Sequence, residues 1–115
     1  MGDMVTGQLL QLGMPAHIHG YHFIRQAVML VMDRPELLGG VTQLLYPEVA
    51  RLFHTTPSRV ERSIRHAISV TWARGGGAAL GDMMARGGYD RHMKPTNCEL
   101  IALLSERLRI RRTWL

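Results

Sequence analysis

Apolar residues recur along the chain at intervals of three and four positions, which is the spacing of an amphipathic α-helix. No stretch alternates polar and apolar residues over the length of a strand. The helical spacing is interrupted at proline and glycine, and it predicts helices over residues 15–33, 35–45, 47–53, 58–74, 80–86 and 96–110. The sequence therefore predicts an all-α fold, a compact bundle of about six helices.

The ends of these helices carry recognisable residues. Three glycines at 75–77 are expected to stop the preceding helix, because glycine tolerates the left-handed geometry of a C-terminal cap. Thr96 and Glu99 are spaced as a capping box for the last helix. Residues 1–12 are mixed and glycine-bearing, so we expect a flexible arm ahead of one domain over residues 13–115. The helix over residues 35–45 is expected to bury Leu37, Leu38, Val41, Leu44 and Leu45.

The segment from Tyr46 to His66 has the pattern of a helix-turn-helix. Ala50 is the small residue expected where the second helix crosses the first, and Val49 and Phe53 are expected to face inward beside it. Thr55 falls in the turn, where His54 occupies a position at which glycine is common. The second helix is expected to bury Val60, Ile64, Ala67, Ile68 and Thr71, and to expose Arg59, Arg62, Arg65, His66 and Ser69.

The exposed face carries three arginines and a histidine against one glutamate, Glu61. The 115 residues have a formal net charge of +5, and thirteen of the fourteen basic residues are arginine. Arginine suits bidentate contacts to phosphate and guanine, although GC-rich coding would favour it equally. A solvated face pairing arginine with Glu61 is the plainer alternative, but it leaves most of the positive charge unpaired. The pattern favours nucleic-acid binding.

Other kinds of chemistry have weaker support. His17, His19 and His22 form the densest histidine cluster, but His17 and His19 point to different sides of a helix, so we expect surface or capping histidines and no metal. Cys98 and His92 lack an orienting or oxyanion motif. We therefore expect no enzyme activity and no cofactor, with Cys98 as a small packed residue.

The chain contains no apolar run near the ~20 residues that cross a bilayer, and no secretion signal. We expect a cytoplasmic protein that does not enter the membrane.

Four stretches together resemble a known family. They are Gly13–Tyr21, Asp33–Gly39, Thr55–Ile68 and Lys94–Asn97. They are similar to the C-terminal DNA-binding domain of the master sporulation response regulator, stage zero sporulation protein A, of endospore-forming Firmicutes. The resemblance covers about residues 12–110. It implies a six-helix bundle that binds double-stranded DNA with the core TGTCGAA, often as a tandem homodimer.

The resemblance also assigns roles to residues. It implies that Arg59, Glu61 and Arg62 read bases and that Arg65 and His66 contact phosphates. The chemistry agrees, since arginine binds guanine O6 and N7 and glutamate accepts from the cytosine amino group.

From position alone, two further residues are candidates for contacts with the DNA backbone. Ser58 lies at the start of the recognition helix, and Arg51 lies on the helix before it. Each also has a plainer interpretation, Ser58 as part of the helix cap and Arg51 as a solvated surface residue.

The sequence departs from this family at two points. The regulator has an N-terminal receiver domain with a phosphorylatable aspartate, which 115 residues cannot also hold, so the sequence represents an excised domain or a stand-alone relative. Residues 75–90 match loosely where the family contacts the RNA polymerase sigma subunit. An alternative function is therefore an interaction module that pairs with a full-length regulator or sigma factor. RNA binding ranks last, because aromatic residues that stack unpaired bases are scattered.

Overall fold

The computed structural model describes residues 2–114, and it describes side-chain environments for residues 2–74 and 77–110. Every regular element in residues 2–114 is helical, which confirms the all-α prediction. The α-helices are α1 (Gly2–Gln11), α2 (His19–Asp33), α3 (Tyr46–Leu52), α4 (Pro57–Thr71), α5 (Gly77–Arg86) and α6 (Asn97–Trp114). A 3₁₀ turn, Pro35–Gly40, and two π-helical turns, Val41–Leu45 and Trp72–Gly76, join them.

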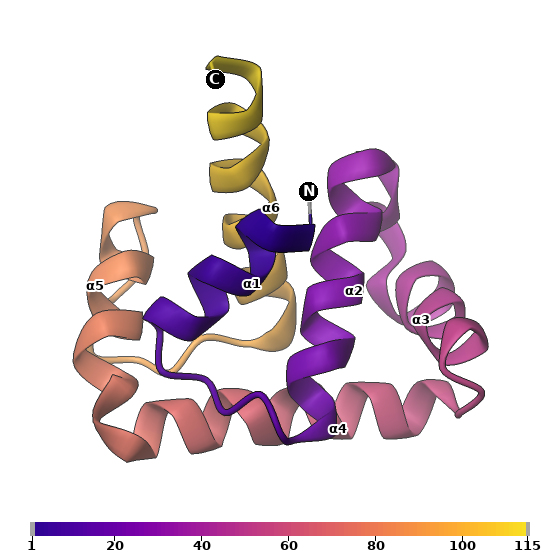
Figure 1. Cartoon of the computed structure of the whole chain (residues 1–115), viewed down its shortest axis with the longest axis horizontal. Coiled ribbons are helices and arrows are strands. Elements are labelled where there is room, and N and C mark those ends of the chain that lie inside the picture. Colours follow the sequence, from indigo (N-terminus) through magenta and orange to yellow (C-terminus); the bar gives the residue numbers. More distant parts are fainter. Residues whose placement is uncertain (1, 115) are drawn as a thin grey trace.

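Helix α2 is the centre of the bundle. It packs chiefly against α4 and α6, and α1 covers it from a third side. Figure 1 shows α4 lying along the bottom of the molecule, with α2 standing on it, α3 at the right end and α5 at the left. No other helix covers the underside of α4 in this view.

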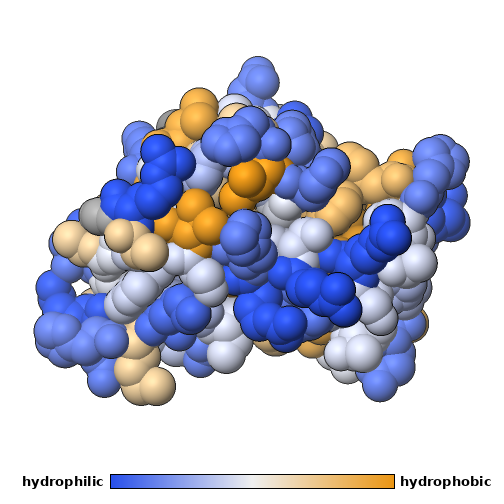
Figure 2. Space-filling model, turned by 90° about the horizontal axis from the view of Figure 1, so that it is seen from below, coloured by the Kyte–Doolittle hydropathy of each residue, from blue (hydrophilic) through white to orange (hydrophobic). Residues whose placement is uncertain are grey.

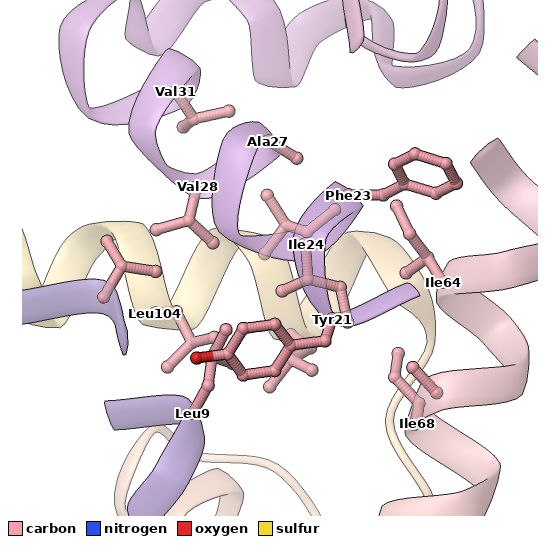
Figure 3. Close-up of a cluster of buried hydrophobic side chains, with 14 of the residues drawn as sticks. Leu9, Tyr21, Phe23, Ile24, Ala27, Val28, Val31, Ile64, Ile68 and Leu104 are labelled. Atoms are coloured by element: carbon pink, nitrogen blue, oxygen red, sulfur yellow. The ribbon is translucent and has the colours of Figure 1, made fainter. Parts of the chain in front are cut away.

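The core forms where these helices meet. Ile24, Ala27 and Val28 on α2 have no exposed surface, and neither do Ile64 on α4 and Leu104 on α6. Figure 3 shows these side chains directed toward one another from the three helices. Burying each large aliphatic side chain contributes about 1.5–3 kcal/mol to stability. Of these residues, the sequence pattern predicted Ile64 to be buried, and it is.

A glycine allows α2 to approach α4 closely. A Cβ atom added to Gly20 would lie 2.1 Å from the carbonyl oxygen of Ser63 and 2.6 Å from the Cβ of Ala67. No real Cβ atom tolerates such distances, so this crossing requires glycine. It places the segment just before α2 directly beside α4.

The N-terminal segment differs from the expected flexible arm. Gly2–Gln11 is helical, and Val5 and Leu9 are completely buried. These residues lie four positions apart, on one face of α1, and they pack onto α2 and α6. Residues 1–12 include an amphipathic helix that their mixed, glycine-bearing composition did not indicate.

Several helix boundaries also differ from the sequence predictions. Helix α2 begins at His19 rather than at residue 15, and residues 15–18 are not helical. The glycines at 75–77 do not end a helix in left-handed geometry, because Gly77 has φ −58° and begins α5 directly after the π-helical turn. Residues 35–45 form a 3₁₀ turn followed by a π-helical turn rather than one helix. The change of pitch moves Leu44 out of the expected buried face, and it is 51% exposed.

No helix in the part of the chain that the structure describes is long and apolar enough to cross a membrane.

Candidate nucleic-acid interface

Helices α3 and α4 and the turn between them form a helix-turn-helix. Val49 and Ala50 are buried on α3, as the pattern predicted. The turn closes with two backbone hydrogen bonds, from the N–H of Thr55 to the carbonyl of Ala50 and from the N–H of His54 to that of Arg51. His54 has φ 54°, so it adopts the left-handed geometry for which glycine is usually chosen.

Phe53 does not face the core as expected. Its side chain is 40% exposed, and its ring meets the edge of Phe23 at a centroid distance of 5.1 Å. Phe53 lies at the C-terminal cap of α3, where the chain already turns outward. The pair Phe23–Phe53 joins α2 to the turn at the surface.

Helix α4 begins with a side-chain cap. The Oγ1 atom of Thr56 accepts a hydrogen bond from the backbone N–H of Arg59 at 3.2 Å, and Pro57 follows at the first helical position. Such a cap stabilises a helix by about 1 kcal/mol. It fixes the start of α4, where the exposed arginines begin.

The two faces of α4 separate as the sequence predicted. Val60, Ile64 and Ala67 have no exposed surface, whereas Arg59 and Arg62 are exposed. The remaining predicted members follow the same division, with Ile68 and Thr71 buried, Arg65 and His66 exposed, and Ser69 half-buried.

Ion pairs divide the basic residues of the motif into two groups. Arg65 Nη1 lies 2.5 Å from Glu61 Oε1, and Arg51 Nη2 lies 2.6 Å from Glu48 Oε1. The hydrogen bond from Arg51 holds the pKa of the Glu48 carboxyl below its usual value and raises that of Arg51. Within the part of the chain whose side chains are described, Arg59 and Arg62 form no ion pair. Their charge is therefore available to a ligand.

The structure also places Ser58 and Arg51, the two candidates for contacts with the DNA backbone that were chosen by position. Ser58 is exposed on the first turn of α4, and the cap is supplied by Thr56 instead. Arg51 is exposed on α3 while it pairs with Glu48.

A buried amide that sequence reasoning did not single out holds α4 in place. Asn97 Nδ2 donates hydrogen bonds to the Tyr46 hydroxyl at 3.1 Å and to the Glu61 carbonyl at 3.0 Å. Burial raises the pKa of Tyr46 against the opposing effect of the hydrogen bond from Asn97. Nearby, Lys94 Nζ donates to Ser69 Oγ at 2.9 Å. The only signal in the sequence was Asn97 directly after the predicted cap, Thr96.

Hollows flank α4 on both sides. One side has two adjoining hollows that share His19, Arg62 and Ser63. The other side has two hollows that share Glu61 and Arg65. Figure 2 views this surface, and strongly hydrophilic side chains form a band across the half that holds α3 and the start of α4. The interface is thus a protruding basic helix between two depressions.

The other candidate sites considered from the sequence concern Cys98 and metal-binding residues. Cys98 is exposed rather than packed, because it lies on the first turn of α6, on the face away from the core. No group of three or more histidine, cysteine, aspartate or glutamate residues within the described range is placed to hold a metal ion.

The chain was compared with protein-family models. The family described as "Sporulation initiation factor Spo0A C terminal" matches residues 5–108. The chain belongs to this family. The match confirms the resemblance drawn from the sequence, and it begins inside α1. The Spo0A C-terminal family is a family of regulatory DNA-binding domains rather than enzymes. This chain is accordingly a DNA-binding domain of the sporulation-regulator type, with DNA as its partner.

Proposed function

We propose that this domain regulates the transcription of sporulation genes by reading a TGTCGAA-like element with α4 in the major groove. The observation that carries the proposal is the pair Arg59 and Arg62, exposed on one face of α4 and without ion pairs in the described part of the chain. An α-helix with its side chains fits the ~12 Å major groove, and each arginine can bind one guanine through O6 and N7.

Glu61 has a more specific role in the proposal. Its carboxylate accepts from Arg65 in the free domain, and on DNA it would accept instead from a cytosine amino group. The released Arg65 would then reach a phosphate. A carboxylate within a basic face repels phosphate, so Glu61 supports sequence reading over general adhesion to DNA.

The remaining contacts are to the backbone. We assign His66, Ser58 and Arg51 to phosphates at the two ends of α4, in addition to Arg65. Arg51 would exchange Glu48 for phosphate, which conserves its charge pairing.

Assembly on DNA forms a further part of the proposal. Two copies would bind tandem elements as a homodimer, and the RNA polymerase sigma subunit would be the partner during activation. Because the DNA of the target genes lies in the cytoplasm, the domain would act there. The stoichiometry on duplexes with one and two elements, measured by analytical ultracentrifugation, tests the homodimer.

The experiment that tests base reading compares Arg62→Ala with Arg86→Ala. Arg86 is exposed at the end of α5, so its replacement removes the same charge away from α4. Fluorescence anisotropy would measure binding to a duplex carrying TGTCGAA and to a scrambled duplex across a salt series. We expect Arg62→Ala to lose about 1–3 kcal/mol of discrimination between the duplexes. We expect Arg86→Ala to keep that discrimination.

Two results would count against the proposal. Undiminished discrimination by Arg62→Ala would show that α4 is misassigned. Equal and steeply salt-dependent binding of the unchanged protein to both duplexes would show that the basic face senses phosphate alone. The interaction-module function would then be the better explanation.

A further inference from the structure

Two histidines that the proposed DNA contacts do not use lie directly beside α4. His17 and His19 line one hollow together with Arg62, Ser63 and His66. We call this hollow the histidine groove. Both histidines are exposed, and they belong to the segment at the start of α2 rather than to the helix-turn-helix.

The backbone holds this segment in place. The close approach at Gly20 sets the start of α2 against the backbone of Ser63. The ring of His19 stacks on Phe23 at a centroid distance of 6.3 Å, and Phe23 in turn meets Phe53. Because these contacts fix the segment on α4, the groove is formed before any ligand binds.

The charge of the groove favours an anion. The titratable and charged side chains that face His17 and His19 from α4 are Arg62 and His66. The adjoining hollow adds Arg59 and His54. No carboxylate lines either hollow, whereas Glu61 lines both hollows on the other side of α4. Helix α2 also begins here without a side-chain cap, so the positive end of its dipole adds to the same field.

We propose that His17 and His19 hold a phosphate of the DNA backbone beside α4, and that DNA affinity therefore rises as the pH falls. The inference rests on the proposed function of α4. A helix that fills the major groove brings its flanks against the two phosphate backbones. Imidazole changes charge between pH 5 and 8, and a protonated ring donates hydrogen bonds from both nitrogens to phosphate. Binding to DNA consequently takes up protons.

The test uses the double variant His17→Gln/His19→Gln, with His22→Gln as the matched control. His22 is an exposed histidine three residues farther along, and it lines neither hollow. Anisotropy would follow binding to the TGTCGAA duplex and to the scrambled duplex, at about pH 6 and about pH 8, across a salt series. Circular dichroism would confirm that each variant is folded.

We expect the unchanged protein and His22→Gln to bind both duplexes several-fold more tightly at the lower pH. The double variant is expected to lose much of that gain and to show a salt slope smaller by about 1 for each lost contact. The ratio of affinities for the two duplexes stays the same, because a phosphate contact carries no sequence information.

Three outcomes would overturn the proposal. In the first, the double variant would match the unchanged protein at both pH values. In the second, it would change the ratio of affinities for the two duplexes while binding the scrambled duplex normally. In the third, inorganic phosphate alone would shift the ring resonances of His17 and His19 in nuclear magnetic resonance spectra until binding is saturated. That result would assign the histidine groove to a free anion. Failure of base reading is distinguishable, because the pH and salt responses on the scrambled duplex do not depend on it.

Discussion

Three residues with positive φ end three helices in the same way. Gly13 after α1 and Gly88 after α5 have φ 78° and 92°, and His54 after α3 has φ 54°. In each case the next residue donates its N–H to a carbonyl five positions back, and the left-handed residue donates three positions back. These two hydrogen bonds together form the Schellman motif. His54 therefore occupies a position suited to glycine, as the sequence pattern suggested.

The substitution His54→Gly is expected to stabilise the domain. A left-handed conformation costs a non-glycine residue about 1–2 kcal/mol. Glycine loses roughly 0.5–1 kcal/mol more than other residues through backbone entropy. The net gain in the free energy of unfolding should be about 0.5–1 kcal/mol, measured by urea denaturation.

The control for this prediction is Gly88→Ala. A Cβ atom at Gly88 would meet nothing within 4 Å, so the effect of this substitution comes from the backbone and not from a steric clash. We expect it to destabilise the domain by about 1 kcal/mol. A loss of stability in His54→Gly would show that the imidazole makes stabilising contacts that outweigh the strain.

At the scale of elements, the sequence predicted local features better than junctions. The capping box of α6 is confirmed, since the N–H of Thr96 donates to Glu99 and the N–H of Glu99 donates back to Thr96 Oγ1. Thr96 and Glu99 lie only three positions apart, so the sequence spacing alone was enough to predict the capping box. The faces of α4 were predictable for the same reason.

The way in which helices join and contact one another depends on interactions between residues far apart in the sequence, which the local spacing of residues does not predict. The bonds from Asn97 to Tyr46 and Glu61 span 51 and 36 positions. The glycines at 75–77 permit a left-handed cap and a right-handed turn alike, and the chain takes the right-handed turn. The sequence allows Glu61 to pair with an arginine of this face, and the ion pair forms with Arg65 without involving Arg59 or Arg62.

The crossing of α2 and α4 gives a prediction at this scale. Gly20→Ala would drive a methyl group into the backbone of Ser63, where no side chain can move aside. We expect a loss of roughly 1–3 kcal/mol in the free energy of unfolding, as for overpacked cores. Urea denaturation measures it.

Gly7→Ala provides the comparison for Gly20→Ala. Gly7 lies in the middle of α1, and an added Cβ atom would meet nothing within 4 Å there. Alanine favours a helix over glycine by about 1 kcal/mol, so this variant should be more stable. Equal effects of the two substitutions would contradict the close crossing.

At the scale of the whole molecule, recognition and stability depend on different sides of the bundle. The exposed face of α4 carries the charge, while α2 joins α4 to α6 and α1 (Figure 1). The basic face contributes little packing, because its arginines lie outside the core. Substitutions there are expected to change DNA binding while leaving the fold intact.

Helix α1 gives the last prediction, which separates a packed helix from a flexible arm. Leu9 and Leu10 are neighbours on α1, with exposures of 0% and 55%. Leu9 belongs to the core cluster that includes residues of α2 and α6. Leu9→Ala should therefore cost about 2–5 kcal/mol, and Leu10→Ala should stay within about 0.5 kcal/mol of the unchanged protein.

Urea denaturation of the two variants measures this difference directly. A domain of this size has about 5–15 kcal/mol of stability, so the loss of Leu9 would place it near the limit of folding. A flexible arm would make both leucines equally dispensable. Equal stabilities would thus refute the docking of α1, whereas a large difference would extend the domain to the first residues of the chain. Because α1 packs chiefly onto α2 and α6 and leaves the underside of α4 uncovered, the folded fraction of Leu9→Ala should keep the duplex preference of the unchanged protein (Figure 1).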